Sequence, residues 1–194
     1  MGEQQVFQPL TREDTITVVF YRVGIVMTTI IISGLAYLLL TASTDLSADA
    51  LAYCLYASVG LSVFFIHLYV GRFKVYLRNL YFVSLACLVA LLIIGKGSIT
   101  GVIVHDSYAA LLLLPLSGCL GFVTAKEAFC FRLFEGYLLA IILPTYLLLV
   151  SGGILVGRSA SYGLVLIAIM LGIFTLRKVF MPISYDIGDK SAYQ

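Results

Sequence analysis

The stretch GCLGFVTAKEAFCFRLFEGYLLAIILP, residues 118–144, places a short charged segment between two long apolar runs. Lys126, Glu127, Arg132 and Glu135 carry both signs of charge within ten residues, and apolar or aromatic side chains separate them. A bilayer core needs about 20 apolar residues per helix, and charged residues gather where helices leave it. The stretch therefore predicts two membrane-spanning helices joined at one membrane surface.

Composition extends this interpretation to the whole chain. Of its 194 residues, 61% are hydrophobic and only 11% are charged, whereas soluble domains carry about 25% charged residues. Such a chain cannot cover a water-facing surface, and its length leaves no room for a second domain of ordinary size. We therefore predict an all-α protein, a polytopic membrane helical bundle whose main partner is the lipid bilayer. The net charge of +2 is too small to indicate a nucleic-acid partner.

The apolar runs predict six transmembrane helices within a membrane domain at residues 16–178, between polar tails at 1–15 and 179–194. The run Ile99–Val104 is too short to cross a bilayer, so it is expected to lie at the interface or to extend the next helix. The predicted spans are 16–40, 51–70, 75–94, 108–125, 133–150 and 160–176.

Lysine and arginine are distributed unevenly over the connections. With six spans, ten of the twelve basic residues fall on the side that holds both termini, and only Lys96 and Arg158 fall on the other. Because cytoplasmic loops carry an excess of basic residues, both tails are expected to be cytoplasmic, or stromal in a plastid. An odd number of spans would remove this asymmetry.

The charged segment is the candidate functional cluster, with Lys126, Glu127, Cys130, Arg132 and Glu135 as its members. In a continuous helix Arg132 and Glu135 would pair at i,i+3. A desolvated carboxylate here could bind a cation or carry protons. Because the segment lies at the membrane boundary, we favour the alternative that the charges reach the headgroups and neutralise one another.

His67 lies near the end of the second span. One reading makes it an axial ligand of a haem or pigment, or a proton relay. The favoured alternative is a hydrogen bond to a neighbouring helix or contact with the interface. A mixed metal site with Glu127 and Cys130 matches no known ligand spacing, so no metal site is predicted and no cofactor is required.

A basic turn follows the second span, with Arg72, Lys74 and Arg78. These residues could bind anionic lipid headgroups, or they could only set the topology. The second interpretation is favoured, because three charges fall short of the clusters of 4–8 that indicate lipid recognition.

The segment KEAFCFRLFEG at residues 126–136, preceded by Gly118 and Gly121, resembles a family of uncharacterised integral membrane proteins (DUF2301-like). The family belongs mainly to cyanobacteria and photosynthetic eukaryotes. The resemblance implies a multi-span helical protein, of a thylakoid or other photosynthetic membrane or of a plasma membrane. It implies no activity and no catalytic residue.

Three functions are compatible with these patterns. The first is a non-enzymatic accessory or assembly subunit of a larger membrane complex, since no catalytic signature is found. The second is a small-solute or ion carrier using Glu127, Glu135 and His67, which predicts a cavity between Pro115 and Pro144. The third is pigment or haem binding through His67.

Overall fold

The computed structural model describes residues 11–41, 46–68 and 70–187. In this part of the chain six helices are long and apolar enough to cross a membrane, which confirms the predicted polytopic helical bundle. The spanning helices are α1 (Arg12–Leu40), α2 (Leu46–Phe65), α3 (Gly71–Ile94), α5 (Leu114–Phe131, preceded by the 3-10 helix η1, Ser107–Leu113), α6 (Phe134–Ser151) and α7 (Arg158–Val179); α4 (Ile99–His105) and α8 (Ser184–Ile187) are short.

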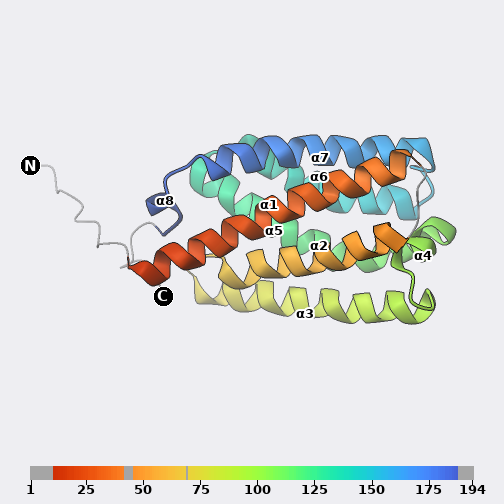
Figure 1. Cartoon of the computed structure of the whole chain (residues 1–194), viewed down its shortest axis with the longest axis horizontal. Helices are drawn as coiled ribbons and strands as arrows, with labels where there is room; N and C mark the ends of the chain where they lie inside the picture. Colours follow the sequence, from red (N-terminus) through yellow and green to blue (C-terminus); the bar gives the residue numbers. More distant parts are fainter. Residues whose placement is uncertain (1–10, 42–45, 69, 188–194) are drawn as a thin grey trace, which may run out of the picture.

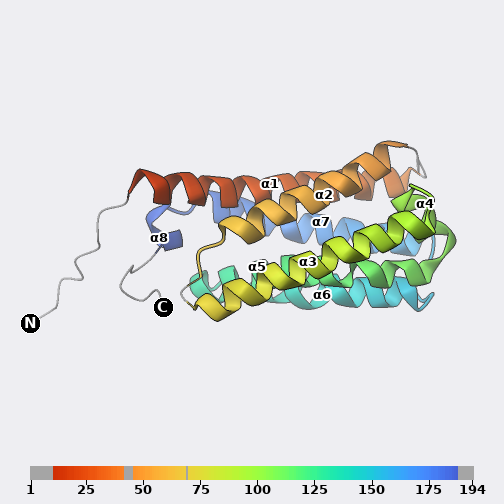
Figure 2. The same ribbon diagram turned by 90° about the horizontal axis from the view of Figure 1, so that it is seen from below.

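The six spanning helices form an elongated ring in which each packs against two neighbours, in the order α1, α2, α3, α5, α6 and α7, and α2 and α5 also touch across the ring. The short helix α8 lies at the end of the bundle where α1 begins, and α4 lies at the opposite end (Figures 1 and 2). We call the two parts of the bundle the α8 half and the α4 half.

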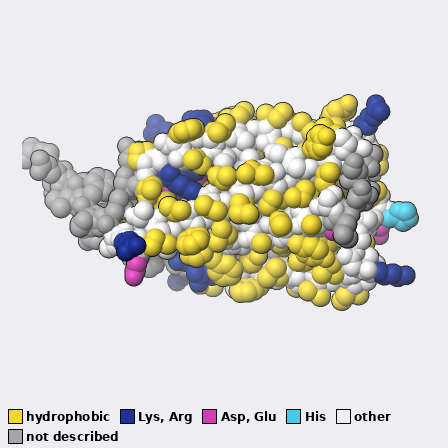
Figure 3. Space-filling view, in the orientation of Figure 1, with side chains coloured by type: hydrophobic (Ala, Val, Ile, Leu, Met, Phe, Trp, Pro, Cys, Tyr) yellow, Lys and Arg dark blue, Asp and Glu magenta, His cyan; other side chains and the backbone are white. Residues whose placement is uncertain are grey.

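Hydrophobic side chains cover most of the surface between the two ends of the bundle, whereas Lys and Arg side chains gather toward the ends (Figure 3). Large apolar residues such as Ile93, Ile141 and Leu166 are more than half exposed. This distribution is typical of helices whose outer faces contact lipid.

The first span begins earlier than the apolar pattern predicts. Thr11 and Asp14 form a capping box, in which the Thr11 amide donates to Asp14 (2.9 Å) and the Asp14 amide donates to the Thr11 hydroxyl (3.3 Å). Such a box satisfies two amides at the helix start. The helix therefore starts at Arg12, and its first turn is polar.

The two prolines of the predicted fourth and fifth spans play different roles. Pro115 lies in the first turn of α5, after the 3-10 helix η1, where its missing amide costs no helical hydrogen bond. Pro144 lies inside α6 and deprives the Ala140 carbonyl of its usual partner. Gly121 of α5 packs against this carbonyl: a Cβ there would lie 3.3 Å from the Ala140 oxygen.

The short apolar run after the third span forms a separate helix, α4, and not an extension of the next span. Asp49 of α2 caps it, because its carboxylate accepts from the amides of Ile99 (3.0 Å) and Thr100 (2.7 Å) and from the Thr100 hydroxyl (2.7 Å). A buried polar contact therefore attaches α4 to the bundle.

Helices α1 and α2 pack closely through small residues. A Cβ on Gly24 would lie 2.9 Å from the Ser58 carbonyl oxygen, and the hydroxyls of Thr28 and Ser58 lie 2.9 Å apart. Small and hydroxyl-bearing residues allow such approach between membrane helices.

Candidate functional site

Five charged side chains converge inside the α8 half, and we call them the buried ion cluster. Arg22 comes from α1, Lys126 and Glu127 from α5, Lys178 from α7 and Asp186 from α8. Glu127 and Lys178 have no exposed surface, and Asp186 is also buried. Burying charge in a membrane protein is costly unless the charges are paired.

Glu127 is the acceptor at the centre of the cluster. Its Oε1 accepts from the Tyr21 hydroxyl (2.7 Å) and from Lys126 Nζ (2.8 Å), and its Oε2 forms an ion pair with Lys178. The interpretation that Glu127 reaches the headgroups is thus corrected. The helix α5 turns this residue toward α1 and α7, so its charge is neutralised inside the protein.

Asp186 is held by two cations from different helices. Arg22 donates to its Oδ2 from Nε (2.8 Å) and lies 2.6 Å from it through Nη2, while Lys178 pairs with Oδ1. Two guanidinium nitrogens thus contact one carboxylate oxygen, and Lys178 contacts the other. Arg22 also donates to the carbonyls of Val179 (3.1 Å), Met181 (2.7 Å) and Pro182 (3.2 Å), so it anchors the chain between α7 and α8.

Aromatic rings cover the ammonium groups. Lys178 Nζ lies 4.0 Å from the centroid of the Phe131 ring, and Lys126 Nζ lies 5.9 Å from that of Tyr21. Ring faces attract cations, and the attraction grows when water is excluded. The cluster contains three cations and two carboxylates, which leaves one positive charge in excess.

The other residues of the charged segment lie apart from this cluster. The helix α5 ends at Phe131, and Arg132 adopts the left-handed conformation (φ 54°), so no continuous helix aligns Arg132 with Glu135. Glu135 instead accepts from Nη1 of Arg177 at 2.7 and 2.8 Å. Cys130 is exposed.

His67 lies just beyond α2 and contacts the start of α1. Its Nε2 is 3.2 Å from the Thr17 hydroxyl, and its Nδ1 is buried without a hydrogen-bond partner. Burial lowers the pKa of His67 below its usual 6.5, and the nearby cations Lys126 and Lys74 add to this effect. No group of three or more metal-binding side chains occurs in the described residues.

The basic turn begins α3. Arg72 and Lys74 occupy its first turn, with Arg72 exposed and Lys74 half-buried. Arg78 lies one turn later, with its guanidinium 5.6 Å from the Phe64 ring centroid. The three side chains stay near the bundle end, and none of the ion pairs or hydrogen bonds in the described part of the chain joins them to the buried ion cluster.

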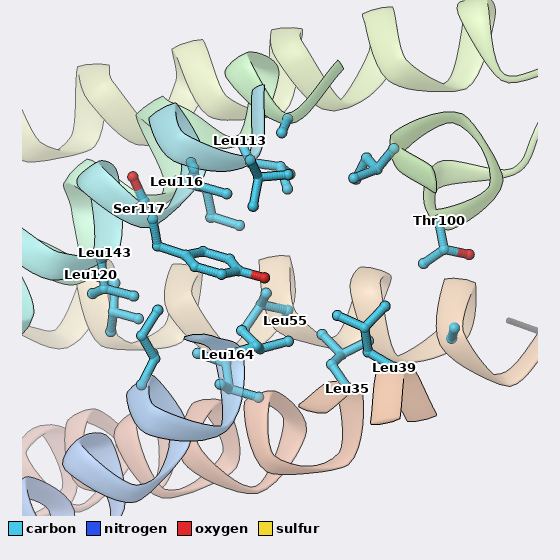
Figure 4. Close-up of a pocket in the computed structure, with 18 of the residues that line it drawn as sticks. Leu35, Leu39, Leu55, Thr100, Leu113, Leu116, Ser117, Leu120, Leu143 and Leu164 are labelled. Atoms are coloured by element: carbon cyan, nitrogen blue, oxygen red, sulfur yellow. The ribbon is translucent and has the colours of Figure 1, made fainter. Parts of the chain in front are cut away.

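An apolar cavity of about 220 Å³ occupies the α4 half. It lies inside the ring, where leucines of α1 and α2 face leucines of η1 and α5 (Figure 4). Every long helix except α3 contributes to its wall. Its lining residues include Leu35, Leu39, Leu55, Leu113, Leu116, Leu120, Leu143 and Leu164.

Three hydroxyl groups line this cavity, and each donates its hydrogen to the protein. Thr100 donates to Asp49 (2.7 Å), Ser117 to the Leu114 carbonyl (2.8 Å) and Tyr146 to the Ala160 carbonyl (3.0 Å). The wall therefore offers no free hydrogen-bond donor from these hydroxyls, and the rest of its lining is almost entirely carbon.

Sequence patterns missed four members of these sites. Arg22 gave a usable signal, because a charge within an apolar run is a default functional hypothesis, and Lys178 marked only the end of the last span. Tyr21 resembled an interfacial tyrosine, and Asp186 lay in a polar tail. The cavity has no sequence signature, since its wall consists of ordinary core leucines.

Comparison with known proteins places the chain in a family but assigns no activity. The profile of a family described as "Uncharacterized integral membrane protein (DUF2301)" matches residues 61–194. No curated protein and no solved structure matches the chain. The matched region begins within α2 and includes all of α5, α7 and α8, so it covers four of the five charged residues of the buried ion cluster.

Proposed function

We propose, for a chain that belongs to this DUF2301 family of integral membrane proteins, that it is a non-enzymatic protein that binds a lipophilic molecule in its apolar cavity. The cavity is the observation that carries the proposal. It lies within the span of the helices that face the bilayer, so a lipid-soluble molecule is the solute most concentrated around it.

The size and chemistry of the cavity define the class of ligand. Its volume is about 220 Å³, whereas an engineered apolar cavity of roughly 150 Å³ stays dry and binds benzene. It can therefore hold a segment of an acyl or isoprenoid chain, with the remainder of the molecule outside. A polar ligand would lose most of its hydration without compensation, because the wall is almost entirely carbon and the hydroxyls of Thr100, Ser117 and Tyr146 can only accept.

Transport of an ion has less support in this geometry. The cavity is bordered by Leu116 and Leu143, each next to one of the prolines predicted to flank a carrier site. However, its wall lacks the polar groups that an ion needs. Glu127 lies in the other half and is already paired with Lys126 and Lys178. Transport of a lipophilic solute, unlike transport of an ion, is compatible with this proposal.

Pigment or haem binding through His67 also has less support. Its Nε2 contacts Thr17, and its Nδ1 is buried among protein atoms. An axial ligand would have to leave this position.

The accessory role predicted from the sequence is kept in this proposal. A protein that holds a lipophilic molecule could serve a larger membrane complex, in a thylakoid or another membrane. Co-purification of the tagged protein with subunits of such a complex tests this part.

The test of binding is photolabelling of the full chain in nanodiscs with a diazirine-bearing palmitate. We expect adducts on residues of the cavity wall, mapped by peptide mass spectrometry. Leu164→Trp fills the cavity and should lower these adducts several-fold. Leu166→Trp is the matched control, because Leu166 lies on the same helix and is 53% exposed on the outer surface.

A second filling variant, Ala110→Leu, guards against misfolding of the tryptophan variant, since Ala110 lines the cavity from η1. Labelling that is spread evenly over the lipid-facing surface, and that neither filling variant changes, would overturn the proposal.

A further inference from the structure

The buried ion cluster has the composition of an anion site whose occupant is part of the chain. Arg22 and Lys178 approach the two oxygens of the Asp186 carboxylate from different helices. Guanidinium and ammonium groups in this arrangement bind carboxylates and phosphates through the same contacts. Asp186 therefore occupies the position that an external anion would take.

The charge balance favours an additional or stronger anion. Lys126 and Lys178 both pair with Glu127, and Lys178 is also shared with Asp186. One cation thus lacks a carboxylate of its own. A phosphate group, with about −1 to −2 charges and several acceptor oxygens, would balance three cations better than a single carboxylate.

The site lies near the ends of two spanning helices, where lipid headgroups are expected. Lys178 is the last residue but one of α7, and Glu127 is four residues from the end of α5. The side chains of Arg22 and Lys126 remain 12% and 11% exposed, so the cluster is not sealed from the surface. Basic side chains are visible in a recess at this end of the molecule (Figure 3).

We propose that Arg22, Lys126 and Lys178 bind the phosphate of an anionic lipid headgroup, and that the Asp186 carboxylate on α8 is displaced when this headgroup binds. The proposal does not depend on a ligand in the apolar cavity, which lies in the other half of the bundle.

The helix α8 is suited to such a displacement. It has only four residues, it follows the end of α7 by a short connection, and it packs against α1. Its described contacts include the Asp186 ion pairs and the buried Ile187 side chain. Arg22 also holds the connection that precedes it. Its release would leave the six spanning helices in place.

The experiment compares the full chain in nanodiscs of phosphatidylcholine with nanodiscs that also contain phosphatidic acid. Hydrogen–deuterium exchange of residues 180–187 reports release of α8, and native mass spectrometry reports bound phosphatidic acid. We expect phosphatidic acid to increase exchange in this segment. Asp186→Ala should tighten lipid binding by about tenfold, because it removes a competing acceptor held by charged donors.

Two arginine variants separate this site from general attraction to an acidic surface. Arg22→Gln should lose the bound lipid, and Arg22→Lys should recover only part of it, since it keeps the charge and lacks the fork. Arg177→Gln is the matched control: it removes an exposed charge next to Lys178 that pairs with Glu135, outside the cluster. It should leave binding unchanged.

Inorganic phosphate added to phosphatidylcholine nanodiscs distinguishes the source of the anion. Release of α8 by phosphate alone would replace the lipid by a soluble anion and overturn the proposal as stated. The proposal is also overturned if phosphatidic acid leaves α8 exchange unchanged and Asp186→Ala does not tighten binding, or if Arg22→Gln and Arg177→Gln weaken binding equally.

Discussion

The α8 half and the α4 half of the bundle are enclosed by many of the same helices, yet they fill the space between them differently. In the α8 half, charged side chains from α1, α5 and α7 meet in a network of ion pairs. In the α4 half, leucines surround an apolar cavity of about 220 Å³.

The two halves differ in how many side-chain arrangements each one tolerates. Ion pairs and hydrogen bonds are directional, and a buried charge without its partner is costly, so the α8 half tolerates few arrangements. Contacts between leucines are not directional, and a cavity absorbs changes in side-chain volume. We therefore expect the α8 half to be sensitive to substitution and the α4 half to be adaptable.

The largest effect should come from Glu127→Gln. This change leaves the three cations of the cluster with one carboxylate, and loss of one partner of a buried pair costs about 3–5 kcal/mol. The free energy of unfolding in detergent measures it. Lys178→Met should cost less, because the pairs Arg22–Asp186 and Lys126–Glu127 remain. If Glu127→Gln and Lys178→Met lower the free energy of unfolding equally, the inference that the cluster has an excess positive charge is contradicted.

The next largest difference between the two halves should come from substitutions that enlarge a buried side chain. Ala128 and Ala110 are both fully buried, but Ala128 lies against Gly136 in the α8 half, whereas Ala110 lines the cavity. Overpacking a filled site costs about 1–3 kcal/mol, so Ala128→Leu should lower the melting temperature. Ala110→Leu should leave it nearly unchanged. Similar losses in both variants would show that the cavity does not accept added volume.

A smaller effect is expected for the ion pair outside the cluster. Arg177 is 52% exposed in its pair with Glu135, and exposed pairs contribute about 0–1 kcal/mol. Glu135→Gln should therefore change unfolding far less than Glu127→Gln in the same assay. If both variants lower the free energy of unfolding by similar amounts, burial does not explain the effect of Glu127→Gln.

The smallest effect should depend on pH. The pKa of His67 is lowered in the folded protein by burial and by Lys126 and Lys74, although Asp14 and Asp186 oppose the shift. The unfolded chain then binds a proton more readily, so stability is fully present above pH 6.5 and falls as the pH drops toward the folded pKa. Melting temperatures between pH 8 and pH 5 should decline less in His67→Gln than in the unmodified protein. Parallel declines would assign the effect to other groups.

Part of the candidate site followed from local sequence. The sequence predicts a functional cluster whose members are Lys126, Glu127, Cys130, Arg132 and Glu135. Of these, Lys126 and Glu127 belong to the buried ion cluster. The predicted Arg132–Glu135 contact did not form, because α5 ends at Phe131 and the chain turns before α6. Helical spacing applies only while the helix continues. The apolar pattern places a connection between residues 125 and 133, but it does not show at which residue of that connection the helix ends.

The sequence by itself determined that this protein is a six-span helical membrane bundle, since length and hydrophobicity decide which segments leave water. It also placed charged residues near the ends of the spans. Only the tertiary structure decided which charges pair and where space remains. Tyr21 and Glu127 are 106 residues apart in the chain, and Arg22 and Asp186 are 164 apart. Such pairs, like the apolar cavity, depend on how the helices pack against one another. Local sequence patterns do not predict that packing.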